Sequence, residues 1–313
     1  MIEKVALNAI FFGAVKLKTN ESCLIVTDKI KEPIARAFYE YAGAITSNVK
    51  ICVMQPTKEH GSEPPPEVEK EMLDYDVQFL ITDKSLSHTK SRRDASNKGA
   101  RIASMPDITE DIINRCCAID YRLLKNESQK LHAVLSNAKQ IKVKTELGTD
   151  IVFDVGKSKW FGENGGSFDY PGAFGNLPEG EVSFAPENAQ GTYVVDASFP
   201  GLGILDFPLY FEVAAGIVKN IRGKYAQTIK DRLDQAGFRA YCVAELGIGL
   251  NPKAKIIGIV LEDEKVKGTV HIAVGNNLSY GGNNDVPLHL DGVITKPDVY
   301  ADDKKIMESG KFL

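Results

Sequence analysis

The strongest constraint on the fold is an alternation of two segment types between residues 21 and 120. Short runs rich in apolar and β-branched residues are separated by longer segments in which apolar residues recur at helical spacing. The strand-like runs are SCLIVTD, VKICVMQ, VQFLITD and ARIASM. The last helical segment, DITEDIINRCCAI, is expected to be capped by Asp107 or Thr109. Strands that alternate with helices form parallel βαβ units, so we predict an open parallel α/β sheet domain over residues 1–138. Neither GxGxxG nor GxxxxGK follows the first strand, which excludes a dinucleotide fold or a P-loop there.

The pattern changes after a predicted helix over 120–139. The segment IKVKTELGTDIVFDVG is typical of a hairpin that turns at Leu147-Gly148-Thr149. Many short β-like runs with Gly and Pro turns follow, interrupted by one clear helix in YAQTIKDRLDQAGF. The Gly-rich segment 162–176 is expected to be a loop, either a lid over a site or a surface loop. We predict a second domain over residues 139–313, mainly antiparallel β with one or two helices, which carries the metal site.

Composition limits the kinds of binding partner and the cellular location that we expect for this chain. The net charge of the 313 residues is −4, so no general surface for nucleic acid is implied, and no stretch is long and apolar enough to span a membrane. The N-terminus has the pattern of an amphipathic helix, without the basic leader of a signal peptide. The five cysteines form no CxxC pair and indicate free thiols in a reducing cytosol. We therefore expect a cytoplasmic protein.

Three residues near the C-terminus have the chemistry of metal ligands. The chain has five histidines, and two of them, His271 and His289, lie close to Asp291. Strand alternation would place His289 and Asp291 on one face, where both could bind one ion. Imidazole and carboxylate together suit Zn, Fe, Co and Mn. A buried histidine bonded to backbone is the alternative for His271.

Two glutamates extend this candidate site. Glu181 follows a Pro-Glu-Gly turn, and Glu245 follows an apolar run, where burial without a partner would be expensive. A solvent-facing position at a strand end is the alternative for Glu245. All five residues together could hold two ions that activate water for amide hydrolysis. A single ion on His271, His289 and Asp291 would instead suit Fe(II) and oxygen chemistry.

Four consecutive motifs in the second half resemble a known family. The runs NLPEGEVSFAP, ELGIGLNP, LEDEKVKGTVHIAVGNN and HLDGVITKP are similar to the thermophilic metallo-aminopeptidases of the aminopeptidase T type. The resemblance implies a homodimeric hydrolase that removes N-terminal residues from peptides with a pair of Co or Zn ions. Mn or Fe, and a single ion, are the other possibilities for the metal. The resemblance also implies five metal ligands, which are Glu181, Glu245, His271, His289 and Asp291. Glu245 would in addition have a catalytic role, as bridging ligand or general base.

The chain departs from that family at one catalytic position. A tyrosine is expected seven residues after the first histidine, where this chain has Leu278. Tyr280, two residues further on, either takes the catalytic role or packs against its neighbours. The same fold family also resembles the dihydroxypyridine dioxygenases, which use one Fe(II) on two His and one Asp. A metallo-aminopeptidase is the leading prediction; a mononuclear Fe(II) ring-cleaving dioxygenase or a non-catalytic relative is the alternative.

Overall fold

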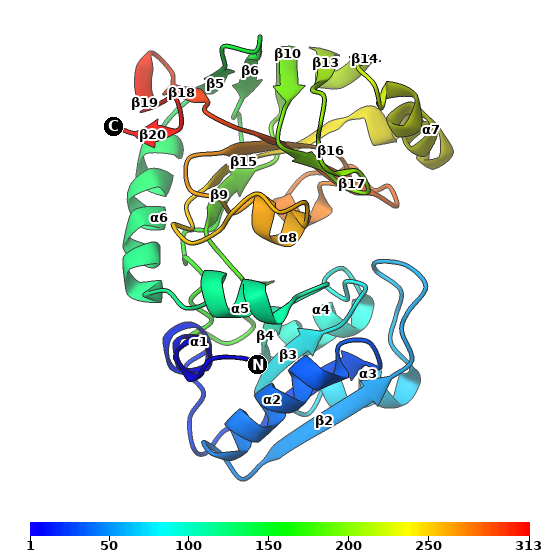
Figure 1. The fold of residues 1–313 in the computed structure, drawn as a ribbon, viewed down its shortest axis with the longest axis vertical. Helices are drawn as coiled ribbons and strands as arrows, with labels where there is room; N and C mark the ends of the chain where they lie inside the picture. Colours follow the sequence, from blue (N-terminus) through cyan, green and yellow to red (C-terminus); the bar gives the residue numbers. More distant parts are fainter. The chain divides into compact units, whose positions relative to one another are not determined.

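The structure, a computed structural model, describes residues 1–313 (Figure 1). By its internal contacts the chain divides into two compact units. The first consists of Met1–Lys125 and Asn164–Glu179, and the second of Asn126–Glu163 and Gly180–Leu313. The predicted domain division at residue 138 stays a prediction.

The first unit is built on a five-stranded sheet in the order β2-β1-β3-β4-β8, with every neighbouring pair parallel. The four long strands fall on the four predicted runs: β1 (Cys23–Asp28), β2 (Val49–Met54), β3 (Val77–Ile81) and β4 (Arg101–Ser104). The helical segments of this unit are α1 (Lys4–Asn8), the π-helix η1 (Ala9–Ala14), α2 (Glu32–Gly43), α3 (Pro66–Met72), α4 (Lys90–Asn97) and α5 (Glu110–Cys116). Thr109, one of the two predicted caps, accepts a hydrogen bond from the N–H of Ile112 at the start of α5.

Both faces of this sheet are covered. On one face Leu24 and Leu80 pack with Met72 of α3 and Ala95 of α4. On the other face Phe79 lies 5.1 Å from the ring of Phe38 in α2 and 4.9 Å from that of Phe11 in η1. Helices on both faces explain why the strands are apolar along their whole length rather than alternating.

The fifth strand comes from the Gly-rich segment. β8 (Phe174–Asn176) pairs in parallel with β4, so residues expected to form a loop extend the sheet. A three-residue strand carries no periodicity, and its partner lies about 70 residues earlier in the chain, so local pattern could not reveal it.

The second unit contains two antiparallel sheets, and α6 (Tyr121–Leu135) leads into it from the first unit. The larger sheet has the order β14-β13-β10-β6-β5-β18-β19-β20. It includes the predicted hairpin, with Gly148 at φ +106° in the turn between β5 and β6. Its strands are β5 (Gln140–Lys144), β6 (Asp150–Asp154), β10 (Asn188–Val195), β13 (Leu209–Ala214), β14 (Ile217–Arg222), β18 (Asp298–Ala301), β19 (Lys304–Glu308) and β20 (Lys311–Phe312).

The smaller sheet has the order β12-β11-β17-β16-β15-β9-β7. Its strands are β7 (Trp160–Phe161), β9 (Glu181–Phe184), β11 (Ser198–Phe199), β12 (Gly203–Ile204), β15 (Val243–Gly249), β16 (Val270–Gly275) and β17 (His289–Ile294). The helical segments of this unit are α7 (Ala226–Ala236), α8 (Val260–Asp263) and the short 3-10 turns η2 (Phe238–Tyr241) and η3 (Leu278–Tyr280). One face of the small sheet packs on the large one: a Cβ at Gly292 of β17 would lie 2.4 Å from Val195 of β10.

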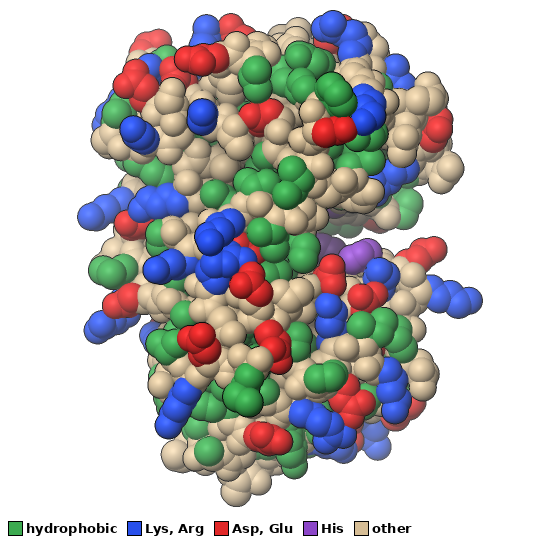
Figure 2. Space-filling model, in the orientation of Figure 1, with side chains coloured by type: hydrophobic (Ala, Val, Ile, Leu, Met, Phe, Trp, Pro, Cys, Tyr) green, Lys and Arg blue, Asp and Glu red, His purple; other side chains and the backbone are tan.

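The predicted fold class, an N-terminal parallel α/β sheet followed by mainly antiparallel β structure, is confirmed. None of the helices has the length and apolar character needed to cross a membrane. On the face drawn in Figure 2, basic and acidic side chains are interspersed rather than gathered into patches of one sign.

Candidate metal centre

The small sheet brings all five predicted ligands to one face. Glu245 of β15 is paired with Ala273 of β16, which in turn is paired with Asp291 of β17. Side chains paired across an antiparallel sheet share a face, and residues two apart on a strand do so as well. The same face therefore also carries His271, His289 and Glu181, the last through its pairing with Gly249.

A glycine makes room for one of the imidazoles. Gly247 is paired with His271, and an ideal Cβ at Gly247 would lie only 2.1 Å from His271 Nε2. The ring therefore lies directly over the glycine backbone, and only hydrogen fits at this position.

The donor atoms lie within coordination range of one another. His271 Nε2 is 3.3 Å from Glu181 Oε2 and 3.7 Å from Glu245 Oε1. His289 Nε2 is 3.0 Å from Glu245 Oε2 and 3.1 Å from Asp291 Oδ1. Three overlapping groups each have one donor atom per residue within 4.8 Å of the others: Glu181, Glu245 and His271; Glu245, His289 and Asp291; Glu264, His271 and Asp291.

The tautomer of His289 favours a metal ion. Its Nδ1 is 2.6 Å from the carbonyl oxygen of Asn276, which can only accept a hydrogen bond, so Nδ1 carries a proton. In a neutral ring Nε2 then directs its lone pair toward the carboxylates. Backbone carbonyls orient metal-binding histidines in this way.

The buried carboxylate oxygens support the same conclusion. Both oxygens of Glu245 and Oε2 of Glu181 are buried and face only the imidazoles of His271 and His289. Glu245 is 1% exposed, and a buried carboxylate in that state is costly. A divalent cation would compensate these charges, so the residues present fit a metal ion.

Two further residues of the centre were not predicted from the sequence. The Lys265 ammonium lies 2.6 Å from Glu181 Oε1 and 2.7 Å from Glu264 Oε1. Lys265 is 1% exposed, although it lies in the charged run LEDEK, which is typical of a solvated surface. The one available signal was that this run ends five residues before a buried strand.

Without a metal, the cluster balances charge through its histidines. Burial disfavours the charged form of His271, but Glu245, Glu181 and Asp291 outweigh it and raise its pKa to about 9. The pKa of His289 is raised above its usual value by Asp291 and Glu245 in the same way, against the effect of burial. Burial would raise the pKa of Glu245, but the two imidazoles hold it below its usual range. A metal ion would replace the imidazole protons.

Tyr280 lies beside the centre as part of an aromatic wall. Its ring stacks on His289, with centroids 5.3 Å apart and planes 20° apart. Phe161 of β7 meets Tyr280 edge-on at 6.0 Å. Burial and the nearby carboxylates raise the pKa of the Tyr280 hydroxyl, so this group stays protonated.

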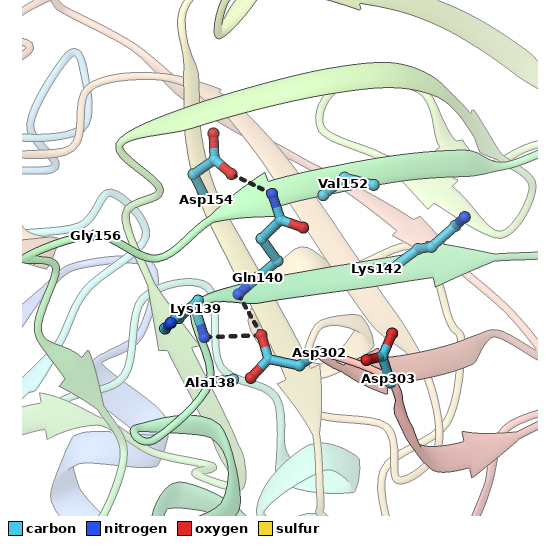
Figure 3. A pocket seen from close by; sticks show the side chains of 9 residues that line it. All are labelled: Ala138, Lys139, Gln140, Lys142, Val152, Asp154, Gly156, Asp302 and Asp303. Carbon is cyan, nitrogen blue, oxygen red and sulfur yellow. Dashed lines mark hydrogen bonds between the residues drawn. The ribbon is translucent and has the colours of Figure 1, made fainter.

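A separate hollow of about 730 Å³ on the larger sheet is unconnected with this chemistry (Figure 3). No residue of the cluster lines it. Its Asp302 accepts hydrogen bonds from the N–H groups of Lys139 and Gln140, and Asp154 accepts one from the Gln140 side chain. These carboxylates therefore serve the local backbone and strand pairing.

Fold and centre together define a two-unit protein whose β-rich unit carries imidazole and carboxylate donors for a divalent metal ion. Residues 11–313 match the family described as NicX, 2,5-dihydroxypyridine 5,6-dioxygenase, and the chain belongs to this family.

Individual relatives agree with this assignment. A 2,5-dihydroxypyridine 5,6-dioxygenase from Pseudomonas putida KT2440 is 27% identical over 213 residues, which are 60% of this chain and 60% of that relative. The matched region thus spans less than two thirds of the relative. The structure of 2,5-dihydroxypyridine dioxygenase from the same organism has a TM-score of 0.85 at 18% identity, covering 99% of this chain and 96% of that one. Wild-type AmpT from Thermus thermophilus has a TM-score of 0.71 at 16% identity, covering 99% and 98%, and is similar in fold alone.

The predicted aminopeptidase is therefore wrong, together with the assignment as a hydrolase, metallopeptidase or protease. The family is that of the dioxygenases, which was the alternative prediction. The error has a physical source, because the two groups share a fold and the motifs report which donors meet on the sheet, not the reaction. A metal cofactor and a small-molecule substrate agree with the family, whereas the predicted Zn or Co pair has no support. The homodimer and the ligand roles of the five residues stay predictions.

Proposed function

We propose that this protein is a mononuclear Fe(II) dioxygenase that opens the ring of a dihydroxylated pyridine. The proposal is supported by family membership and by one observation of geometry. Asp291 has a carboxylate oxygen within 4.8 Å of a donor nitrogen of His289 in one group of donors and of His271 in another, and the three side chains share one face of one sheet. Two imidazoles and one carboxylate are the donor set of non-haem Fe(II) oxygenases.

His271, His289 and Asp291 would hold the iron, which supplies open positions at which oxygen and a hydroxylated substrate can be activated together. Around them the chain supplies fixed groups. The Asn276 carbonyl orients His289, and the absence of a side chain at Gly247 leaves room for the His271 ring. The buried carboxylate of Glu245, which faces the two imidazoles, is placed to accept the proton of a substrate hydroxyl.

The aromatic wall suits a flat substrate. Tyr280 and Phe161 extend from His289 as apolar surface beside the polar cluster. Rings of this kind bind an aromatic substrate by offset or edge contacts and exclude water from the centre. In the proposed enzyme, Tyr280 is a substrate-positioning residue rather than the catalytic tyrosine of a peptidase.

Oxygen consumption tests the proposal. Protein loaded anaerobically with Fe(II) should take up O₂ when 2,5-dihydroxypyridine is added, with one O₂ per substrate molecule consumed. The His271→Ala variant should take up none, while His132→Ala, which changes a histidine outside the cluster, should match the unchanged protein. An iron-loaded protein that consumes no O₂ with any dihydroxypyridine would refute the proposed reaction.

A further inference from the structure

Lys265 places a buried positive charge inside the candidate metal centre. Its ammonium nitrogen lies 2.6 Å and 2.7 Å from one oxygen each of Glu181 and Glu264. The other oxygen of Glu181 faces His271 Nε2 at 3.3 Å. One oxygen of Glu181 therefore contacts the ammonium group, and the other lies among the candidate metal ligands.

The backbone fixes this lysine in place. The carbonyl of Lys265 accepts a hydrogen bond from the N–H of Asn251 at 2.8 Å. The next carbonyl, that of Val266, approaches Gly249 so closely that a Cβ there would lie 2.0 Å from it. Because Gly249 is paired with Glu181, this packing sets Lys265 beside Glu181. An ordinary surface lysine has no such constraint.

In a two-metal centre, the second metal ion would have to lie between Glu181 and another carboxylate. Two-metal sites place their ions a few Å apart and share carboxylates between them. Here an ammonium group holds that position, and a divalent ion could bind the same oxygens only if the ammonium left. Lys265 is 1% exposed, so its ammonium would have to leave a buried position before an ion could bind there.

We propose that Lys265 acts as a built-in second cation, which occupies Glu181 and Glu264 and thereby limits the centre to one metal ion. The inference rests on the proposed one-iron function. It also explains how five ligand-type residues in the sequence can belong to a centre for a single ion. Lys265 is a positioning residue in this account, because it acts through the two glutamates.

Metal stoichiometry tests the proposal without any activity assay. The whole chain and three variants are titrated with Co²⁺ or Mn²⁺, and bound metal per chain is measured after removal of excess ion. The unchanged protein should bind one ion and Lys265→Met two. Lys265→Met combined with Glu181→Gln should return to one. Lys267→Met, which removes a nearby lysine paired with Glu127 instead, should stay at one.

Folding of Lys265→Met provides a second readout, because the loss of the ammonium leaves two carboxylates unpaired. Excess Co²⁺ should raise the Tm of this variant more than that of the unchanged protein, since a second ion would replace the lost charge. A variant that binds one ion, or that stays unfolded in excess metal, would overturn the proposal, as would two ions in the unchanged protein. An unchanged protein that binds none would instead refute the proposed function.

Discussion

The substitution Gly247→Ala tests whether the His271 ring needs the space above Gly247 in order to bind a metal ion. The added Cβ would lie 2.1 Å from His271 Nε2 and 2.2 Å from Cε1, whereas ordinary contact begins at 3.4 Å. The ring must therefore move by about 1.3 Å. Without metal it can do so by turning about its side-chain bonds, at a cost of about 1–3 kcal/mol.

With metal bound, the same movement is far more costly. A ligand nitrogen must stay within about 0.2 Å of its bonding distance, so a shift of this size breaks or strains the bond. Changes in groups that merely orient a ligand lower metal affinity by about 10- to 100-fold. We expect Gly247→Ala to reach at least the upper end of this range, about 100-fold or about 2.8 kcal/mol.

The assay is a competition titration of Fe(II) or Co²⁺ against a chelator of known affinity, paired with urea unfolding of the metal-free protein. Gly43→Ala is the matched control, because a Cβ at Gly43 meets no atom within 4 Å. It should leave metal affinity unchanged. If Gly247→Ala binds metal as tightly as the unchanged protein, His271 is not a ligand and the reasoning fails.

Two further predictions concern the segment between the two histidines. Tyr280→Ala should raise KM for a dihydroxypyridine about 2- to 12-fold, since an aromatic pair contributes about 0.5–1.5 kcal/mol, while Tyr280→Phe should keep KM and kcat. A large loss of kcat in Tyr280→Phe would instead make the hydroxyl catalytic. The buried amide of Asn284 donates to the carbonyls of Gly275 and Arg239 at 2.6 Å and 2.8 Å. Asn284→Ala should therefore lower the free energy of unfolding by about 1–3 kcal/mol in urea, with the exposed Asn283→Ala as an unaffected control. Equal stability of the two variants would show that these bonds do not hold the segment.

Much of the fold is predictable because it depends on local periodicity. The four apolar runs of the first unit and the turn at Gly148 each carry a signal within a few residues. β8 carries none, since its three residues become a strand only through pairing with β4. The sequence likewise predicts that strands follow residue 139, but not that they form two sheets, because sheet order depends on distant pairings.

The residues of the candidate site were likewise predictable only where a local pattern reveals them. Alternation along β17 predicts that His289 and Asp291 share a face, and the register of β15, β16 and β9 adds the others. Lys265 escaped prediction because a charged run is normally solvated, and its burial depends on the approach of Val266 to Gly249. In the proposed account this side chain decides whether the centre holds one ion or two, a distinction that the ligand motifs do not carry.

In the proposed enzyme, the reactant that the centre activates is oxygen and not water. The most direct measurement is the fate of labelled oxygen: iron-loaded protein is given 2,5-dihydroxypyridine under ¹⁸O₂ in unlabelled water, and the rapidly quenched product is analysed by mass spectrometry. A dioxygenase incorporates both labelled atoms into the ring-opened product. A product that carries oxygen only from water, in a reaction that proceeds equally well without O₂, would contradict the account.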